Sequence, residues 1–303
     1  MSQENKYCPA GHSSADFCSG TRNYIDFSGL CFLCSREHSI QEFKTWSSGN
    51  TIIDKIIQES QINVFYKLLW IPYDNFQNIE HIADGGHGSV YSAKIENGIK
   101  RKWNFINQDW VYDFKGNKVA LKEIKDSRYD IAEFCKAVTT VKNFNYSINY
   151  YGISKNPSTQ NYIIVMELFD EDLHNFLIKN FWDLRWNKKI DMLFSIACSI
   201  ANLRLANLVH CDLHSGNVLM MDYFDPRDFC LPYDPSSCKI ENDLILNSNN
   251  KNNKIYGSIP YIPPEVLRGN EFTRKGDIYS FGGIMYEIAT AQRRFPTKHM
   301  ILI

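Results

Sequence analysis

The N-terminal stretch of the chain and the region that follows it differ in how their apolar residues are spaced. Residues 1–45 contain few periodic apolar positions and are rich in Ser, Cys and Gly, so they cannot build a sizeable core by themselves. From Thr51 to Leu68 the apolar residues recur mostly every three or four positions, which predicts an amphipathic helix. We expect this helix to end before Pro72, because the residue that precedes a proline is disfavoured in helical geometry.

The remainder of the chain is predicted to be rich in strands first and helical afterwards. Short apolar runs begin near Asn78, and the span from Val90 to Lys122 is expected to hold two strands, with Trp110, Tyr112 and Phe114 alternating on one face. The later elements are predicted as a helix over 130–144, a strand over 161–168, and helices over 186–205 and 277–291, with an irregular segment over 222–254.

Composition narrows the class of protein. The 303 residues are 44% hydrophobic and 22% charged, with a formal net charge of −1, which is ordinary for a globular protein of one large or two modest domains. This near-zero net charge argues against a nucleic-acid partner or a polybasic membrane anchor. The N-terminus is polar and no apolar run approaches the ~18 residues of a membrane span. We therefore expect a cytoplasmic or nuclear protein without a membrane partner.

The stretch from His210 to Asn217 carries the strongest chemical signal. Asp212 follows His210 by two residues, and Asn217 follows Asp212 by five. Phosphoryl transfer needs a carboxylate to orient the attacking hydroxyl and an amide oxygen on a metal ion. The spacing matches the loop H-R-D-x-x-x-x-N, in which both groups lie on one tight turn.

Four further motifs surround this loop in a fixed order. A glycine-rich turn (82–90) and the run Val119–Ala120–Leu121–Lys122 precede it, and Pro263–Pro264–Glu265 and Asp277–Ile278–Tyr279–Ser280–Phe281–Gly282 follow. The chain thus resembles a eukaryotic-type protein kinase domain, in particular the tyrosine-kinase-like branch. The resemblance implies an α+β, two-lobed fold over 76–303, with a β-rich lobe over about 76–166, a helical lobe over about 167–303, and ATP between them.

The chain stops at Ile303, before the last helices of such a domain. We therefore expect a C-terminally truncated domain in which Glu265 lacks its usual Arg partner.

The resemblance assigns residues to the nucleotide. Glycines let the turn lie close over the phosphates, Lys122 would neutralise the α- and β-phosphates, and Met166 would be the gatekeeper of the adenine site. A simple hairpin turn is the alternative for the glycine-rich segment. The full expected set is Ile82, Ala83, Gly85, Gly86, Gly88, Val90, Ala120, Lys122, Met166, Glu167, Phe169 and Leu219.

The resemblance also assigns the catalytic and metal groups. Asp212 would orient the substrate hydroxyl and accept its proton, with Lys122 and Asn217 completing the catalytic set and Asn217 binding Mg²⁺. Cys211 replaces the usual Arg, so control through a phosphorylated activation loop is not expected. Asp228 is the expected second Mg²⁺ ligand, Asp225 is its rival, and a loop without a metal-binding carboxylate is a third reading.

One helix departs from the family pattern. Ala137 occupies the position of the Glu that usually pairs with Lys122. Glu133 lies one helical turn earlier and would reach Lys122 only if the helix shifts by about 5–6 Å.

The N-terminal cysteines predict a zinc module. Cys31-x-x-Cys34 is a metal-binding half-site, Cys8 begins an altered second one, and either His12 or Cys18 would be the fourth ligand. Free thiols are the alternative. The expected organisation is a cysteine-rich module over 1–46, a helical linker over 47–75 and the kinase-like domain over 76–303.

These features predict an enzyme that transfers the γ-phosphate of ATP, with Mg²⁺, to Ser or Thr of a protein substrate, with Tyr left open. The rival hypotheses are a pseudokinase that binds nucleotide or acts as a scaffold, and a zinc module that serves as a protein-interaction tag on a degenerate domain.

Overall fold

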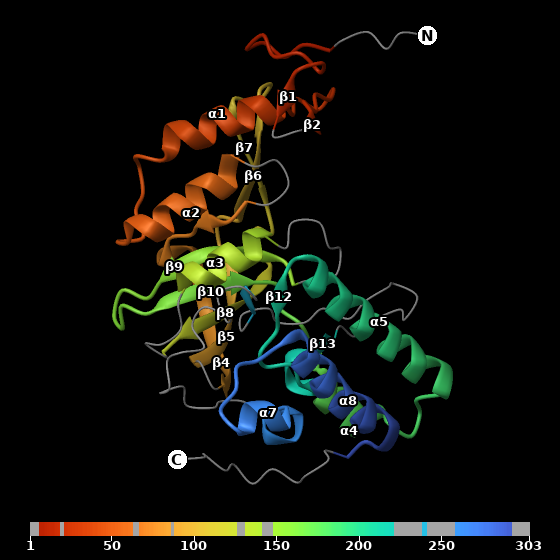
Figure 1. Ribbon diagram of the computed structural model, residues 1–303. Helices are drawn as coiled ribbons and strands as arrows, with labels where there is room; N and C mark the ends of the chain where they lie inside the picture. The colour runs from red at the N-terminus through yellow and green to blue at the C-terminus, as the bar shows by residue number, and fades with distance from the viewer. Residues whose placement is uncertain are drawn as a thin grey trace, which may run out of the picture. The chain divides into compact units, whose positions relative to one another are not determined.

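The computed structural model describes residues 6–18, 21–62, 67–85, 88–125, 131–140, 148–220, 238–240 and 258–292. The chain forms two compact units, which are described separately. Unit 1 comprises Met1–Cys135 and Asn149–Leu168, and unit 2 comprises Lys136–Ile148 and Phe169–Ile303. The α+β class is confirmed, with strands concentrated in unit 1 and helices in unit 2 (Figure 1).

The main sheet of unit 1 has six strands in the order β3-β9-β10-β8-β5-β4. All neighbouring pairs are antiparallel except β3 and β9, which are parallel. Apolar side chains from these strands make one core that includes Ile95, Leu121 and Val165. The strands are β3 (Leu69–Trp70), β4 (Phe76–Gly85), β5 (Gly88–Ile95), β8 (Lys118–Ile124), β9 (Tyr150–Lys155) and β10 (Tyr162–Met166).

A hairpin is inserted between β5 and β8. It consists of β6 (Ile99–Asn104) and β7 (Asp109–Asp113), which pair only with each other among the described strands. The prediction of two strands between Val90 and Lys122 was therefore wrong, because this span contains the hairpin as well as β5 and the start of β8.

The N-terminal part of unit 1 contains two helices, α1 (Phe32–Glu42) and α2 (Thr51–Ile62), and the short paired strands β1 (Phe17–Cys18) and β2 (Thr21–Arg22). Helix α2 was predicted to reach Leu68 but ends at Ile62. The Ser60 hydroxyl accepts the Leu68 N–H at 3.0 Å, and Gln61 donates to the Leu68 carbonyl at 3.2 Å. These bonds bring Leu68 back beside the last helical turn, where it is buried.

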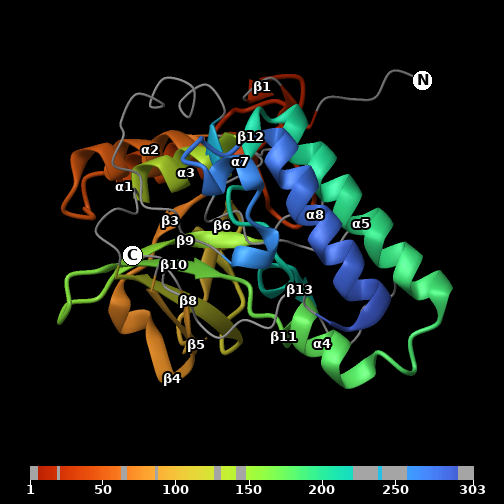
Figure 2. The ribbon, with the colours of Figure 1, turned by 60° about the horizontal axis from the view of Figure 1, so that its bottom comes forward.

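Unit 2 is built on three helices, α4 (Leu173–Asn180), α5 (Trp186–Leu205) and α8 (Arg274–Thr290). Helices α5 and α8 lie side by side in both ribbon views (Figure 2). Their facing sides and α4 share a core that includes Leu177, Ile196 and Ile284. No helix among the described residues is long and apolar enough to cross a membrane.

Short elements complete the description. They are α3 (Ile131–Thr140), α7 (Pro264–Leu267), β11 (Glu171–Asp172), β12 (Leu208–Val209), β13 (Leu219–Met220), β14 (Lys239–Ile240), and the 3-10 helices η1 (Tyr73–Asn75), η2 (Ser215–Asn217) and η4 (Ile259–Tyr261).

Candidate functional site

Hydrogen bonds between Asp212 and Asn217 hold their loop in a tight turn. The Asn217 Nδ2 donates to the carbonyl oxygen of Asp212 at 2.7 Å and to its Oδ2 at 3.2 Å. Because both partners are acceptors, the amide must present its nitrogen to them, which turns Oδ1 away. Oxygen is the ligand atom that Mg²⁺ prefers. The orientation of Asn217 therefore fits the predicted Mg²⁺ ligand, with the Asp212 carboxylate beside it.

Helix α8 anchors this loop through a buried carboxyl group. Asp277 is 3% exposed and accepts the backbone N–H of His210 at 2.8 Å and of Cys211 at 3.3 Å. Burial raises the pKa of Asp277 to about 7, although both hydrogen bonds favour its ionised form. Cys211 has a φ of +67°, an uncommon conformation for a residue with a side chain. The backbone before Asp212 is thus held by α8 in a strained conformation.

A second set of polar groups fixes the end of the loop. The hydroxyls of Ser215 and Tyr261 lie 3.2 Å apart, and the Tyr261 hydroxyl donates to Glu287 on α8. Glu287 is 1% exposed, and its other carboxylate oxygen contacts Nδ1 of His174 on α4. The Ser280 hydroxyl donates to the Tyr261 carbonyl oxygen at 2.7 Å. This network ties η2 and the segment before α7 to two helices of unit 2.

His214 is a site residue that the sequence analysis did not single out. Its Nδ1 accepts the Gly216 N–H at 3.0 Å and caps η2, so the proton of the neutral ring lies on Nε2. That Nε2 is 3.7 Å from the Asp212 Oδ2. The signal available in the sequence was its position, two residues after Asp212 and three before Asn217.

The predicted nucleotide residues of unit 1 gather on four adjacent strands, β4, β5, β8 and β10. In the register of the sheet Val90 on β5 and Ile164 on β10 flank Lys122 on β8, and Met166 is paired with Ala120. Ala120 and Met166 are buried, whereas Val90 and Lys122 are partly exposed. The sheet therefore brings together residues from three separate sequence motifs.

The glycine-rich turn joins β4 to β5. Ile82, Ala83 and Gly85 lie on β4, where they are exposed, and Gly85 is paired with Gly88. A Cβ at Gly88 would lie 1.9 Å from the carbonyl oxygen of Glu123, so the close approach of β8 by itself requires glycine there. Strands β4 and β5 pair in antiparallel fashion on either side of the turn, and this pairing is compatible both with a simple hairpin and with a phosphate-binding loop.

The segment after β10 contains Glu167 and Phe169, two of the residues predicted to contact the nucleotide. The Glu167 N–H donates to the Asn149 carbonyl at 3.0 Å, and Asn149 Nδ2 donates to the Glu167 carboxylate at 2.7 Å. These bonds fix the backbone directly after Met166. Phe169 is partly exposed and belongs to unit 2, as does Leu219 on β13.

Several predicted positions lie outside the described residues. These are Gly86 in the turn, Asp225 and Asp228, and the side chains of Cys18 and Ala137. Glu133 lies in the first turn of α3, and its ion pair with Lys122 stays a prediction.

Comparison with known proteins identifies the family. Residues 76–301 match the family described as protein tyrosine and serine/threonine kinase. The chain belongs to this protein kinase family. Protein kinases in general transfer a phosphoryl group from ATP, with Mg²⁺, to a protein substrate.

Individual relatives of this kinase chain are distant. It is 24% identical to the probable serine/threonine-protein kinase roco5 and 25% identical to the probable serine/threonine-protein kinase kinX, both of Dictyostelium discoideum. It is 26% identical to the leucine-rich repeat receptor protein kinase MSP1 of Oryza sativa subsp. japonica. The matches cover 82%, 78% and 72% of this chain but only 8%, 20% and 16% of the relatives. The chain thus spans a fifth or less of these three proteins.

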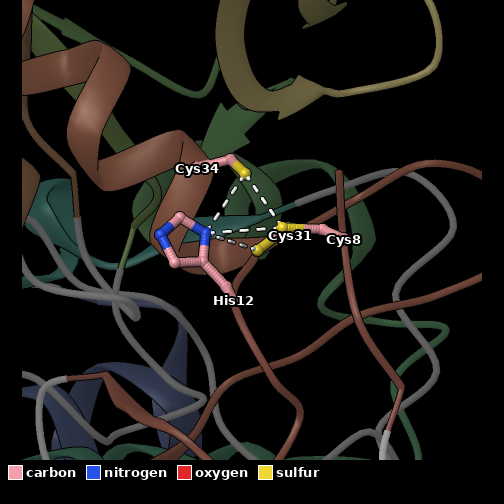
Figure 3. A group of neighbouring side chains, drawn as sticks. All are labelled: Cys8, His12, Cys31 and Cys34. Carbon is pink, nitrogen blue, oxygen red and sulfur yellow. Dashed lines mark hydrogen bonds between the residues drawn. The ribbon is translucent and has the colours of Figure 1, made fainter. Parts of the chain in front are cut away.

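Ahead of the matched region, the kinase chain carries a cluster of three cysteines and one histidine. The ligand atoms of Cys8, His12, Cys31 and Cys34 all lie within 4.8 Å of one another, and Figure 3 shows them converging. The Cys8 and Cys34 sulfurs are 3.6 Å apart, and His12 Nδ1 is 3.4 Å from each. Tetrahedral zinc requires separations of about 3.8 Å between sulfurs and about 3.6 Å between sulfur and nitrogen. The cluster is close to those spacings.

Local sequence explains how the four ligands meet. Gly11 adopts a φ of +87°, and its N–H donates to the Cys8 carbonyl at 2.9 Å, which turns His12 back toward Cys8. Cys31 is the N-cap of α1, and Cys34 lies in the first turn of that helix. In the altered half-site that begins at Cys8, Gly11 stands where a second cysteine would be. In the structure it is the turn residue that positions His12.

Neighbouring polar groups orient these ligands. The Nε2 of His12 lies 3.1 Å from a Glu37 carboxylate oxygen, so Nδ1 is the atom left to bind a metal. The Asn23 Nδ2 donates to the Cys31 sulfur at 3.5 Å, and the Asn23 Oδ1 accepts the Leu33 N–H at 3.2 Å. A carboxylate behind a histidine and an amide on a sulfur are typical of a metal site.

Proposed function

We propose that this chain transfers the γ-phosphoryl group of ATP to Ser or Thr hydroxyls of a protein substrate. The observation that supports it best is the Asp212–Asn217 pair, which presents a carboxylate and an amide oxygen turned away from it on one loop. Two of the relatives named above are described as probable serine/threonine-protein kinases. Tyr specificity is the alternative outcome for the acceptor.

Each residue has one task in the proposed reaction. The Asp212 carboxylate orients the substrate hydroxyl and takes its proton as the oxygen bonds to the γ-phosphorus and the bond to ADP breaks. Lys122 neutralises the α- and β-phosphates, and Asn217, with Asp228 as the proposed second ligand, would hold Mg²⁺. The ion supplies positive charge that neutralises the transferring phosphoryl group. The strands that carry Val90, Ala120 and Met166 would enclose the adenine.

The test is phosphotransfer from radiolabelled ATP by the wild type and by Asp212→Asn. The variant should lose about 10²–10⁴-fold in rate while it still binds ATP, because Asp212 acts on the hydroxyl and not on the nucleotide. Full activity in the variant would show that the assignment is wrong. Ala137, at the place of the usual Glu, favours a pseudokinase instead. That reading predicts ATP binding by the wild type without detectable transfer.

We also propose that the Cys8, His12, Cys31 and Cys34 cluster holds one zinc ion. Soft thiolates with one imidazole suit zinc, and a set of four protein ligands corresponds to a closed structural site. Zinc content measured on the purified chain tests this directly, with one equivalent expected. An interaction role for the module remains the alternative to a purely structural one.

A further inference from the structure

The proposed zinc ligands are themselves most of the core of the N-terminal module. The buried apolar cluster in this region consists of Cys8, Ile25, Cys31 and Cys34. Among the described residues of this cluster, only Ile25 is a buried side chain that does not offer a metal ligand. A core this small cannot hold a fold by hydrophobic burial, so its order depends on what joins the ligands.

The inserted hairpin belongs to two cores at once. At its base, Ile99 is buried in the core of the main sheet, and Phe114, just after β7, packs against the same core. Toward its tip, Trp103 and Phe105 pack against the cysteine cluster. The hairpin is therefore a continuous two-stranded connection between the metal site and the sheet that carries Lys122.

The loop that leads into Cys31 holds the hairpin tip. Leu30 forms an isolated β-bridge with Asn104, and the Phe105 N–H donates to the Gly29 carbonyl at 2.8 Å. Gly29 adopts a φ of +95°, and a Cβ there would lie 2.4 Å from the Asn104 side chain, so any other residue would be strained at this contact. Gly29 and Leu30, which make these contacts, lie within two residues of the proposed zinc ligand Cys31.

Helix α1 holds the rest of the hairpin. The Ser35 hydroxyl accepts the Trp103 N–H at 2.9 Å, and the ring of His38 stacks on Trp103 with centroids 3.6 Å apart. At the end of the helix, the Glu42 carboxylate accepts from Lys100 at 2.7 Å and from the Trp110 indole at 2.8 Å. Cys31 is the N-cap of the same helix and Cys34 lies in its first turn, so the proposed metal site fixes the start of the surface that the hairpin contacts.

We infer that zinc in this cluster acts as a structural brace for the nucleotide lobe, holding α1 on the inserted hairpin and so steadying the sheet that carries Lys122. The inference rests on the proposed zinc site. It does not rest on phosphotransfer. Zinc occupancy sets the order of residues 99–113, and a chain without zinc keeps unit 2 intact while this hairpin loosens.

The test uses the full chain and combines metal analysis with hydrogen exchange. Zinc is measured before and after treatment with excess EDTA, and exchange is followed in peptides covering 99–113 and, as an internal reference, α5 (186–205). Chelation should raise exchange in 99–113 by about tenfold or more and leave α5 unchanged, and added zinc should reverse the effect.

Three variants separate zinc binding from the contacts between α1 and the hairpin. Cys31→Ser should remove zinc and reproduce the effect of EDTA, whereas Cys198→Ser, a partly exposed cysteine on α5, should do neither. Glu42→Ala removes two contacts with the hairpin and no ligand, so it should keep one zinc while exchange in 99–113 rises. If Cys31→Ser does not fold, titration of the wild type with EDTA and zinc gives the same comparison.

The outcomes distinguish the two proposals. A chain purified without zinc that takes up none on addition overturns the zinc site and the brace together. A chain that holds one zinc, and in which chelation leaves exchange of 99–113 unchanged, overturns the brace alone.

Discussion

The Nε2 of His214 lies 3.7 Å from the Oδ2 of Asp212, while the other nitrogen of the same imidazole ring caps the turn that follows. One side chain therefore serves two purposes that substitution can separate. His214→Asn keeps a side-chain acceptor for the Gly216 N–H, whereas His214→Ala loses it.

Both His214 variants should reduce kcat by about tenfold with little change in the KM for ATP, because both remove the ring beside Asp212. Only His214→Ala should also lose stability, by ~1 kcal/mol, since it loses the cap. Steady-state kinetics and urea unfolding of both variants provide the measurements. Unchanged kcat in His214→Asn would mean that the ring has a capping role only.

Lys122→Ala should abolish the stabilisation of the chain by Mg-ATP. A ligand at a hundredfold excess over its dissociation constant adds ~2.7 kcal/mol to the wild type. Thermal unfolding with and without Mg-ATP measures the effect, and Lys118→Ala, on the same strand but exposed, is the matched control. An equal thermal shift in wild type and Lys122→Ala would remove Lys122 from the nucleotide site.

Asp277 makes the stability of unit 2 depend on pH. Its pKa is raised by burial from 3.8 to about 7, so the folded state holds a proton that the unfolded state releases. The stabilisation is full below pH ~4 and is lost as pH rises through about 7, by an amount of up to about 4 kcal/mol. The difference in unfolding free energy between wild type and Asp277→Asn should therefore fall over this window. A difference that stays constant would show that the carboxyl is ionised throughout.

Glu37→Ala should weaken zinc binding without removing a ligand. Because Glu37 orients His12, its loss should cost about 10–100-fold in affinity. His12→Ala should cost at least as much, and Cys18→Ala should have no effect if His12 is the fourth ligand. Competition with a chromogenic chelator ranks the variants. Loss of zinc in Cys18→Ala with retention in His12→Ala would reverse the ligand assignment.

The chemistry of the loop from His210 to Asn217 could be predicted from sequence because it depends on spacing within eight residues. The same holds for the half-site Cys31-x-x-Cys34. Helix α1 could not be predicted, because its buried positions are Cys34, Ser35 and Ser39, which leave no apolar period to detect. Motifs defined by short spacings could therefore be recognised in the sequence, whereas helix α1, which packs through small polar residues, could not.

The hairpin was predicted only in part, through the alternation of Trp110 and Tyr112 on β7, and the end of α2 was missed, both for a different reason. Strand β6 carries Lys100, whose partner Glu42 lies 58 residues away, and such a contact leaves no local trace. The apolar period of α2 continues in the sequence to Leu68. In the structure, however, the side chains of Ser60 and Gln61 in the last turn of α2 hydrogen-bond the backbone of Leu68, so Leu68 does not extend the helix. In both places a tertiary contact overrides the local pattern.

The double attachment of the inserted hairpin bears on where this protein can be cut for recombinant work. A fragment that begins at Phe76, the first residue matched to the kinase family, would keep β6 and β7 but lose α1 and the cysteine loop that cover Trp103 and Phe105. It would also lose β3, which completes one edge of the main sheet. Exposed aromatic side chains and an open strand edge both promote aggregation. We therefore expect the expressible unit of this kinase to begin well before Phe76, at the proposed zinc ligands.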